Sequence, residues 1–401
     1  MKRHGSFWIW AVILFPFAWL ATPGCGGSSG EYTAQLVAGP FLSTVTQDSA
    51  TIIWQTDNKE KAVLEYGPTD SYGKKASGQV TKVTLGTGEF FLNTVSLGGL
   101  EPVTWTHYRI ASLSQPSQDF SFRTAPAPGG EFRFMVYGDS RPAWPVILET
   151  PDDSVHQEIL SKMKELAPDF VVNTGDLVYD GTDPAEWDHF FSVLGSFGST
   201  FPYYPVLGNH DQGGAGVISG FFGTPPDVYY SFDYGNSHFT VINTYLDFSP
   251  TSVQYQWLAK DLTDAKQRAG ITRLFAFMHA PAYSSAPAHE DDQADKNATD
   301  YLAPLFTSQG VKIVFQGHVH VYERTKAISG ASGTLNPTGV VYIVTGGGGA
   351  PIYDAGPLNA QPWTVYKESV HHFIEMSVGS NYLTLEAKYT DGTVFDTANY
   401  Q

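Results

Sequence analysis

Five apolar segments of this chain each end in residues that commonly bind metal ions, and this repeated pattern constrains the fold more than any other feature. The segments are residues 132–137, 170–173, 203–207, 273–277 and 312–315. Near-continuous apolar runs of this length are typical of strands buried on both faces of a sheet. If the segments are neighbouring strands, the loops at their carboxyl ends meet in one crevice, where open α/β sheets bind ligands.

The loops that follow these segments carry carboxylate, amide, phenol and imidazole groups. They read Gly138-Asp139-Ser140-Arg141, Gly175-Asp176-Leu177-Val178-Tyr179, Gly208-Asn209-His210-Asp211, Met278-His279 and Gly317-His318-Val319-His320. A lone His or Asp is more often a hydrogen-bonded structural residue than a ligand. That interpretation is kept for His156, His189, His238, His371 and His372. For the five motifs it would require five coincidences in order, so the set predicts a site for two metal ions.

Length and charge set further limits on the protein. At 401 residues the chain is longer than one ordinary core, so two domains are expected. Lys and Arg number 23 against 40 Asp and Glu, which gives a formal net charge of -17. This charge argues against nucleic acid as a partner, because binding nucleic acid needs a basic footprint. A phosphate site would need local positive charge, which bound metal ions supply.

Residues 1–24 predict an export signal of the lipoprotein type. A basic start is followed by an apolar stretch, residues 7–20, that is short for a transmembrane helix. Cys25 is the only cysteine, so no intrachain disulfide can form. The residues before it resemble the lipobox of bacterial lipoproteins, although Thr22 stands where Leu is usual. We therefore expect export to the bacterial periplasm or cell surface, with membrane contact only through a lipid on Cys25. The alternative is an ordinary cleaved signal with an incidental cysteine.

Composition divides the remaining chain into a tether and two domains. Residues 25–35 are a Gly/Ser-rich flexible tether. Residues 36–124 alternate apolar and polar positions between Gly, Pro and Asp turns, which predicts a small β-sandwich. Its aromatics Trp54, Tyr66 and Tyr108 are expected in the core, with carbohydrate binding as the alternative. Residues 125–130 form a linker, and residues 131–401 alternate strands and helices, as in a layered α/β domain.

Three local features of the second domain carry narrower expectations. Ser154 is the expected N-cap of a helix over residues 155–166, and a second helix is expected from about residue 251 to 265. The run Thr345-Gly346-Gly347-Gly348-Gly349-Ala350 lacks the Lys-Ser/Thr of a phosphate loop, so it predicts a tight strand-to-loop passage beside the site. Glu290-Asp291-Asp292 is interpreted as a solvated loop.

The five motifs, their order and the preceding β domain resemble the purple acid phosphatases of the metallophosphoesterase superfamily. Further similarity lies in residues 230–239, 254–258 and 317–324, and in Tyr179, which superfamily members outside this group lack. Residues 93–102 and 106–109 resemble a fibronectin type III strand pair. The resemblance covers roughly residues 36–390. It implies an α+β/β chain, with an N-terminal fibronectin type III-like β-sandwich followed by a four-layer α/β/β/α metallophosphoesterase domain.

The resemblance also implies a division of the metal ligands. Asp139, Asp176, Tyr179 and His320 would bind Fe(III), and Asp176 would bridge to a second ion, Fe(II), Zn or Mn, held with Asn209, His279 and His318. A hard ferric ion prefers carboxylate and phenolate oxygens, whereas an amide carbonyl and two imidazoles suit a divalent ion. Two such ions lower the pKa of bound water and generate the attacking hydroxide.

Three residues that are not metal ligands are candidates for the chemistry around the phosphate. By resemblance, His210 and His289 bind the phosphate and help to protonate the leaving group, which a histidinium can do at mildly acid pH. Arg141 stands where the family usually has Gly. It could bind a phosphate or a substrate carboxylate, or it could point outward and pair with a surface acid.

The predicted function is hydrolysis of small-molecule phosphate monoesters by an exported acid phosphatase. One alternative is a phosphodiesterase on the same scaffold. The other is an inactive surface protein whose β domain binds a partner, which the intact ligand set argues against.

Overall fold

The computed structural model describes residues 32–400 apart from residues 86–87, 143–151 and 290–291. The predicted signal, Cys25 and residues 25–31 of the tether lie outside the described residues. Within the described part, no helix is long and apolar enough to cross a membrane.

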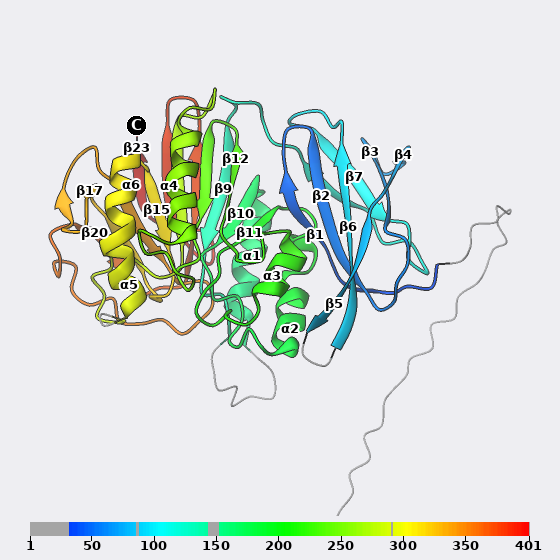
Figure 1. Ribbon diagram of the computed structural model, residues 1–401, viewed down its shortest axis with the longest axis horizontal. Coiled ribbons are helices and arrows are strands. Elements are labelled where there is room, and N and C mark those ends of the chain that lie inside the picture. Colours follow the sequence, from blue (N-terminus) through cyan, green and yellow to red (C-terminus); the bar gives the residue numbers. More distant parts are fainter. Residues whose placement is uncertain (1–31, 86–87, 143–151, 290–291, 401) are drawn as a thin grey trace, which may run out of the picture. The chain divides into compact units, whose positions relative to one another are not determined.

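The first eight strands form a β-sandwich in the part of the chain that the structure describes (Figure 1). They are β1 (Leu36–Val45), β2 (Ser49–Thr56), β3 (Val63–Gly67), β4 (Lys74–Ser77), β5 (Gln79–Leu85), β6 (Gly88–Gly98), β7 (Trp105–Ile110) and β8 (Phe120–Arg123). The strand orders of its two antiparallel sheets are β1-β2-β6-β5 and β4-β3-β7-β8. Trp54 and Tyr108 are fully buried between the sheets, and Tyr66 packs against the same core. The core role expected for these aromatics is confirmed, and the carbohydrate-binding alternative is wrong for Trp54 and Tyr108.

Two further sheets face each other in the second domain. One has the order β11-β10-β9-β21-β22-β23 and the other the order β12-β13-β14-β15-β19-β16-β20. The first comprises β9 (Phe132–Tyr137), β10 (Phe170–Asn173), β11 (Tyr203–Pro205), β21 (His372–Val378), β22 (Leu383–Tyr389) and β23 (Val394–Tyr400). The second comprises β12 (Tyr230–Tyr234), β13 (Ser237–Val241), β14 (Arg273–Met278), β15 (Ile313–Gln316), β16 (Tyr322–Thr325), β19 (Val341–Thr345) and β20 (Thr364–Glu368). A short ribbon, β17 (Ile328–Ser329) with β18 (Thr334–Leu335), stands apart.

Aromatic side chains fill the space between the two large sheets. Phe134 of β9 stacks on Phe170 of β10, with ring centroids 5.1 Å apart, and meets Phe275 of β14 edge-on at 5.6 Å. Side chains alternate along β9, so that Phe134 and Val136 face this core while Met135 and Tyr137 face the outer helices. Both faces of the sheet are therefore buried, which explains its near-continuous apolar strands.

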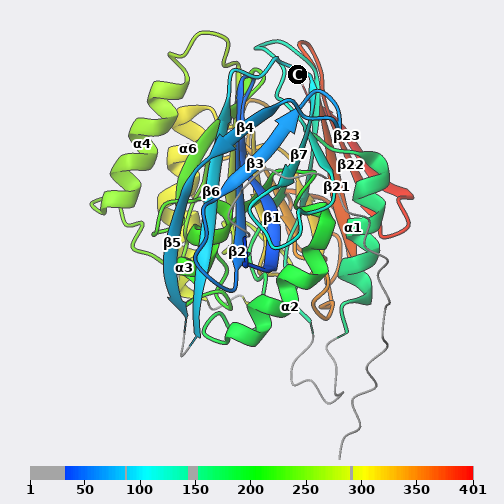
Figure 2. The ribbon, with the colours of Figure 1, turned by 90° about the vertical axis from the view of Figure 1, so that its right-hand side faces the viewer.

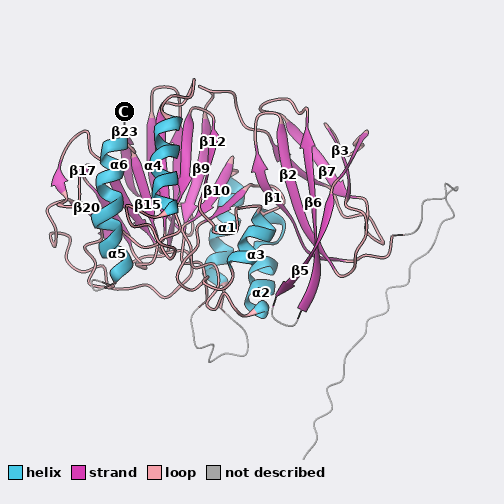
Figure 3. Cartoon of the chain, in the orientation of Figure 1, coloured by secondary structure: helices cyan, strands magenta, loops and turns pink. Residues whose placement is uncertain are grey.

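Helices cover the outer face of each large sheet and complete the expected four layers. Helices α1 (Ser154–Leu166), α2 (Pro184–Leu194) and α3 (Ala215–Phe222) pack against the first sheet, with the short helix η1 (Gly195–Phe197) after α2. On the second sheet lie α4 (Val253–Ala265), η2 (Ala298–Leu302) and α6 (Ala303–Gln309), with α5 (Gln293–Asn297) just before them. Figure 2 shows α4 and α6 on one side of the strands and α1 on the other, and Figure 3 shows the same elements coloured by type.

The two expected helices form, but the predicted start of the first one is wrong. Helix α1 begins at Ser154 itself, and Asp153 holds the N-cap position without a side-chain cap hydrogen bond. The reason is tertiary, because the Asp153 carboxylate pairs with His189 of α2 instead. Helix α4 has a regular cap, in which Ser252 Oγ accepts a hydrogen bond from Tyr255 N at 3.1 Å.

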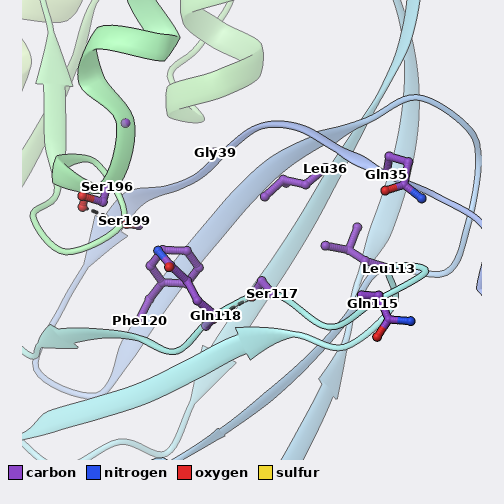
Figure 4. Close-up of a pocket in the computed structure, with 11 residues that line it drawn as sticks. Gln35, Leu36, Gly39, Leu113, Gln115, Ser117, Gln118, Phe120, Ser196 and Ser199 are labelled. Carbon is purple, nitrogen blue, oxygen red and sulfur yellow. Dashed lines mark hydrogen bonds between the residues drawn. The ribbon is translucent and has the colours of Figure 1, made fainter. Parts of the chain in front are cut away.

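The β-sandwich packs against the first-sheet side of the second domain. Phe41 of β1 lies among Phe191, Phe221 and Phe222, and Tyr108 donates a hydrogen bond to Ser199 O at 2.7 Å. A cavity of about 470 Å³ opens at this junction (Figure 4). The cavity is lined by uncharged polar side chains and by apolar ones, and no charged side chain among the described residues lines it. The polar ones include Gln35, Gln118 and Ser196, and the apolar ones Leu36, Leu113 and Phe120. None of the predicted site residues lines it, so this cavity is not the catalytic crevice.

Candidate metal centre

The predicted ligands lie at the carboxyl ends of five strands, as the sequence indicated, but these strands belong to two sheets. Strands β9, β10 and β11 are parallel neighbours in one sheet, and β14 and β15 are parallel neighbours in the other. Asp139 follows β9 and Asp176 follows β10, while His279 directly follows β14. The crevice therefore forms where the ends of two facing sheets meet, and each sheet supplies part of the ligand set.

Backbone strain is concentrated at these loops. In the described part of the chain, four of the eight non-glycine residues with positive φ are predicted site residues: Asp139 (57°), Asp176 (55°), His289 (63°) and His318 (69°). The left-handed region is costly for residues other than glycine and persists only where the surroundings impose it. Such strain at predicted ligands is typical of a functional site.

Three predicted ligands form a tight, buried group. Oxygen and nitrogen donors of Asp139, Asp176 and His320 lie within 4.8 Å of one another, and all three residues are buried. His320 Nε2 is 3.4 Å from Asp139 Oδ1. These are side chains from β9, β10 and β15 loops, so residues far apart in the sequence converge here.

Two further predicted ligands continue this group. His279 Nε2 lies 3.4 Å from Asp176 Oδ1 and 3.9 Å from Asp139 Oδ1. Asn209 Oδ1 is 3.1 Å from His279 Nε2. Asp176 thus stands between the Asp139 side and the His279 side, which is the place for a bridging carboxylate.

The donor set fits bound cations. Asp139 is 0% and Asp176 1% exposed, and two buried carboxylates so close together need positive charge beside them. Burial raises the pKa of Asp139, but His279 and His320 outweigh this effect and bring the pKa below its usual value. Burial also lowers the pKa of His318 to about 4, so its imidazole is neutral and free to bind a cation at mildly acid pH.

Hydrogen bonds to the opposite ring nitrogen orient the imidazoles. Nδ1 donates to a backbone carbonyl at 2.7 Å in three cases: His279 to Thr174, His320 to Pro351, and His210 to Tyr179. In each ring, Nε2 is then left to face the crevice. This is the arrangement by which metal-binding histidines are usually held in one tautomer and one orientation.

Tyr179, His210 and Arg141 lie together beside Asp176. The Tyr179 ring is 4.7 Å from the His210 ring and 5.1 Å from the Arg141 guanidinium carbon. His210 Nε2 is 4.0 Å and Arg141 Nε 3.6 Å from Asp176 Oδ2. Burial lowers the pKa of His210, which Asp176 partly opposes.

Arg141 is 7% exposed, so the outward orientation considered from the sequence is wrong. Its Nε is buried without a hydrogen-bond partner among the described residues. Asp176 Oδ2 lies 3.6 Å from this nitrogen without a hydrogen bond, so the buried N–H can still donate to an anionic ligand.

Asp292 contacts two of the predicted site histidines. Its Oδ2 accepts hydrogen bonds from His318 Nε2 at 2.7 Å and from His289 Nδ1 at 3.0 Å. The Asp292 side chain is 46% exposed, so it is solvated as expected, but it also has two histidine partners that the sequence did not indicate, while residues 290–291 lie outside the described part. His289 reaches the site through this carboxylate and through ring contact with His318 at 4.0 Å.

Asp211, for which the sequence predicted no role, joins two of the loops. Its Oδ2 accepts from Asp176 N and Gly208 N, both at 2.9 Å. Its Oδ1 accepts from Leu177 N at 2.9 Å and Val178 N at 3.2 Å. Its position at the end of the third motif could have indicated a role in the site, but a local pattern does not show which backbone amides the carboxylate bonds.

The glycine run forms the tight passage that the sequence predicted. A Cβ atom added at Gly346 would lie 2.9 Å from Asp139 Oδ2, and one at Gly348 would lie 2.4 Å from Gly138 O. Gly348 N and Ala350 N donate to Gly138 O and Asp139 O, both at 2.8 Å. The glycine run therefore fixes the backbone of the loop that carries Asp139.

Comparison with known proteins agrees with this geometry. Residues 132–322 match the family model of calcineurin-like phosphoesterases, and residues 40–124 match that of the purple acid phosphatase N-terminal domain. Purple acid phosphatase 21 of Arabidopsis thaliana is 30% identical over 331 residues, which cover 77% of this chain and 70% of that protein. Probable purple acid phosphatase 20 of the same plant is 28% identical over 328 residues, covering 77% and 73%.

The fold shows the same likeness. The structure of a purple acid phosphatase from yellow lupin (Lupinus luteus) seeds matches with a TM-score of 0.77 at 23% identity, over 92% of this chain and 74% of that one. Members of this family depend on two metal ions, and the clustered donors of Asp139, Asp176 and His320 agree with such a requirement. The chain belongs to the purple acid phosphatase family and is a metal-dependent phosphoric ester hydrolase.

Proposed function

We propose that this chain is an exported acid phosphatase that hydrolyses small phosphate monoesters. The observation that carries the proposal is the buried group of Asp139, Asp176 and His320, with Arg141 and His210 beside it. A nearby orphan guanidinium donor and an oriented imidazole are what a phosphate ester needs in addition to metal ions.

Asp139, Asp176, Tyr179 and His320 would hold Fe(III), and Asp176, Asn209, His279 and His318 would hold Fe(II), Zn or Mn. When bound, such a pair of cations neutralises phosphate charge and lowers the pKa of a coordinated water. The assignment is supported by donor chemistry, because oxygen donors gather on the first side and imidazoles on the second.

His210 and His289, the proposed leaving-group acids, are held by different hydrogen-bond partners. His210 is held by its Nδ1–H bond to Tyr179 O, so that in the protonated ring Nε2–H can donate to a phosphate oxygen or to the departing alkoxide. His289 is held through Nδ1 by Asp292, which leaves its own Nε2 for the leaving group. In the imidazolium form, each residue would then present an Nε2–H donor in a fixed ring orientation.

Arg141 favours monoesters over the phosphodiester alternative. A monoester dianion carries one more negative charge than a diester, and a buried guanidinium beside the bridging carboxylate compensates for part of it. Arg141→Gly should lower kcat/KM for monoesters by roughly ten- to a hundredfold, as expected for lost charge-assisted hydrogen bonds. Arg141→Lys keeps the charge but not the planar donor pair, so its kcat/KM should lie between those of the wild type and Arg141→Gly.

The testing experiment compares a monoester with a diester of the same alcohol on purified protein, with metal analysis of the same sample. The proposal predicts two metal ions per chain and higher kcat/KM on the monoester, a preference that Arg141→Gly reduces. Faster turnover of the diester by the wild type would favour a phosphodiesterase instead. Absence of turnover with both metals bound would contradict the enzyme role on these substrates.

The cellular place of the enzyme is part of the proposal. Export with a lipid on Cys25 would tether the catalytic domain to a membrane surface through residues 25–35. Phosphate released there from external esters would then be available for uptake.

A further inference from the structure

One carboxylate oxygen links a predicted metal ligand to the predicted leaving-group acid. Asp292 Oδ2 accepts from His318 Nε2 at 2.7 Å and from His289 Nδ1 at 3.0 Å, and the two imidazole rings lie 4.0 Å apart. Each histidine thus donates to Asp292 from one ring nitrogen, and its other ring nitrogen remains for a different ligand.

The local backbone is built for this contact. Asp292 N donates to His289 O at 3.0 Å, which closes a turn in which the side chains of the two residues lie within hydrogen-bond distance of each other. His289 adopts the left-handed conformation within this turn, at φ 63°. Asp292 also holds the N-cap position of α5, yet its side chain makes no cap hydrogen bond within this described helix. An Asp at this position normally caps its helix, whereas this carboxylate bonds the two histidines instead.

His318 is fixed at two points. Its backbone N–H donates to both carboxylate oxygens of Asp139 at 3.1 Å, and its ring is held through Nε2 by Asp292. With Nε2–H bonded to the carboxylate, Nδ1 is the nitrogen with a lone pair for a cation. Carboxylate–histidine–metal groups of this kind fix the tautomer and raise the affinity for the ion.

We propose that Asp292 is a positioning residue that orients His318 toward the second metal ion and His289 toward the leaving group. Second-metal affinity and leaving-group protonation then depend on the same carboxylate. This inference rests on the proposed function for its second half, whereas the metal half can be tested without turnover.

Asp292→Ala tests both halves, with Asp292→Asn as the milder variant that keeps one neutral acceptor. Asp300→Asn, an exposed carboxylate on the neighbouring helix η2, is the matched control. Circular dichroism and thermal unfolding establish that each variant is folded.

The first readout is zinc affinity of the second site, measured by competition with a chelator while iron remains bound. Loss of the orienting carboxylate should weaken zinc binding roughly 10- to 100-fold in Asp292→Ala, less in Asp292→Asn, and not at all in Asp300→Asn. Unchanged affinity in Asp292→Ala would overturn the inference. A third equivalent of zinc in the wild type that Asp292→Ala removes would also overturn it, since Asp292 would then be a ligand.

The second readout is the dependence of kcat on the leaving group, at saturating metal. p-Nitrophenolate departs without a proton, whereas an alkoxide needs one, so Asp292→Ala should slow an alkyl phosphate at least roughly tenfold more than p-nitrophenyl phosphate. His289→Gln should show the same selectivity, and the double variant should add little. Equal slowing of both substrates would overturn the shared role even if zinc binding weakens. If the wild type hydrolyses neither ester, the proposed function fails, while the zinc measurement still decides the metal half.

Discussion

Replacing Asp211 by Asn is expected to destabilise the protein far more than its conservative character suggests. Asp211 is 0% exposed, and its two oxygens accept four backbone N–H groups from the loops that carry Asp176 and Asn209. An amide keeps only one acceptor oxygen. Whichever way it is oriented, two accepted bonds are lost and an NH₂ group faces two N–H donors.

The magnitude follows from the bonds that are lost. Hydrogen bonds to a charged group contribute about 1.5–3 kcal/mol each, so losing two predicts a decrease of about 3–6 kcal/mol in the free energy of unfolding. This is a large share of the roughly 5–15 kcal/mol that stabilises a typical domain. Burial raises the pKa of Asp211 to about 7, with Asp176 adding to the effect, so the measurement belongs at pH 8, where the carboxylate is charged.

Urea denaturation of wild type and variant measures the change, with Asp247→Asn as the control. Asp247 is exposed and accepts a single backbone bond within its own loop, from Ser249 N at 2.9 Å, so its replacement should change stability by less than about 0.5 kcal/mol. Metal content of Asp211→Asn should fall as well, because the two ligand loops lose their common anchor. A change below about 1 kcal/mol would refute the view that the carboxylate holds these loops together.

Four other variants test separate features. Asp176→Ala should abolish both activity and metal binding, because Asp176 is the proposed bridging ligand of both ions; near-normal turnover with two metals bound would contradict the ligand assignment. Tyr179→Phe should remove visible absorption from the iron-loaded protein without unfolding it, so a persistent band excludes Tyr179 as the phenolate ligand. Burial lowers the pKa of His156 to about 3 in the folded protein, against about 6.5 in the unfolded chain. Between these two pH values only the unfolded chain binds the proton, so the free energy of unfolding falls as the pH drops below about 6.5. Between pH 7 and 4.5 the loss is roughly 2–3 kcal/mol, and His156→Gln should remove it from urea-unfolding curves; parallel pH profiles of the two proteins would disprove the assignment. Cys25→Ser should move the protein from the membrane pellet to the soluble fraction, and a wild type that is already soluble after export would exclude the lipid anchor.

Local pattern in the sequence was enough to predict strands, donors and their order. All five apolar runs form strands, and Asp139, Asp176 and His320 converge at their carboxyl ends. This works because burial on both faces of a sheet requires a continuous apolar run, and because strand ends place loops at the sheet edge. The glycine run could be interpreted in the same way, since only glycine fits where a Cβ atom would meet Asp139.

Other features depend on contacts between residues far apart in the chain. Asp153 leaves its helix uncapped to pair with His189, and Arg141 turns inward toward Asp176. Asp292 contacts His318, and Asp211 reaches amides more than thirty positions away. A loop side chain has several rotamers that local sequence allows, and the long-range partner selects one of them. The sequence by itself therefore determined the strands, the donors and the family, whereas only the tertiary structure decided how two sheets share one crevice and which carboxylates orient its histidines.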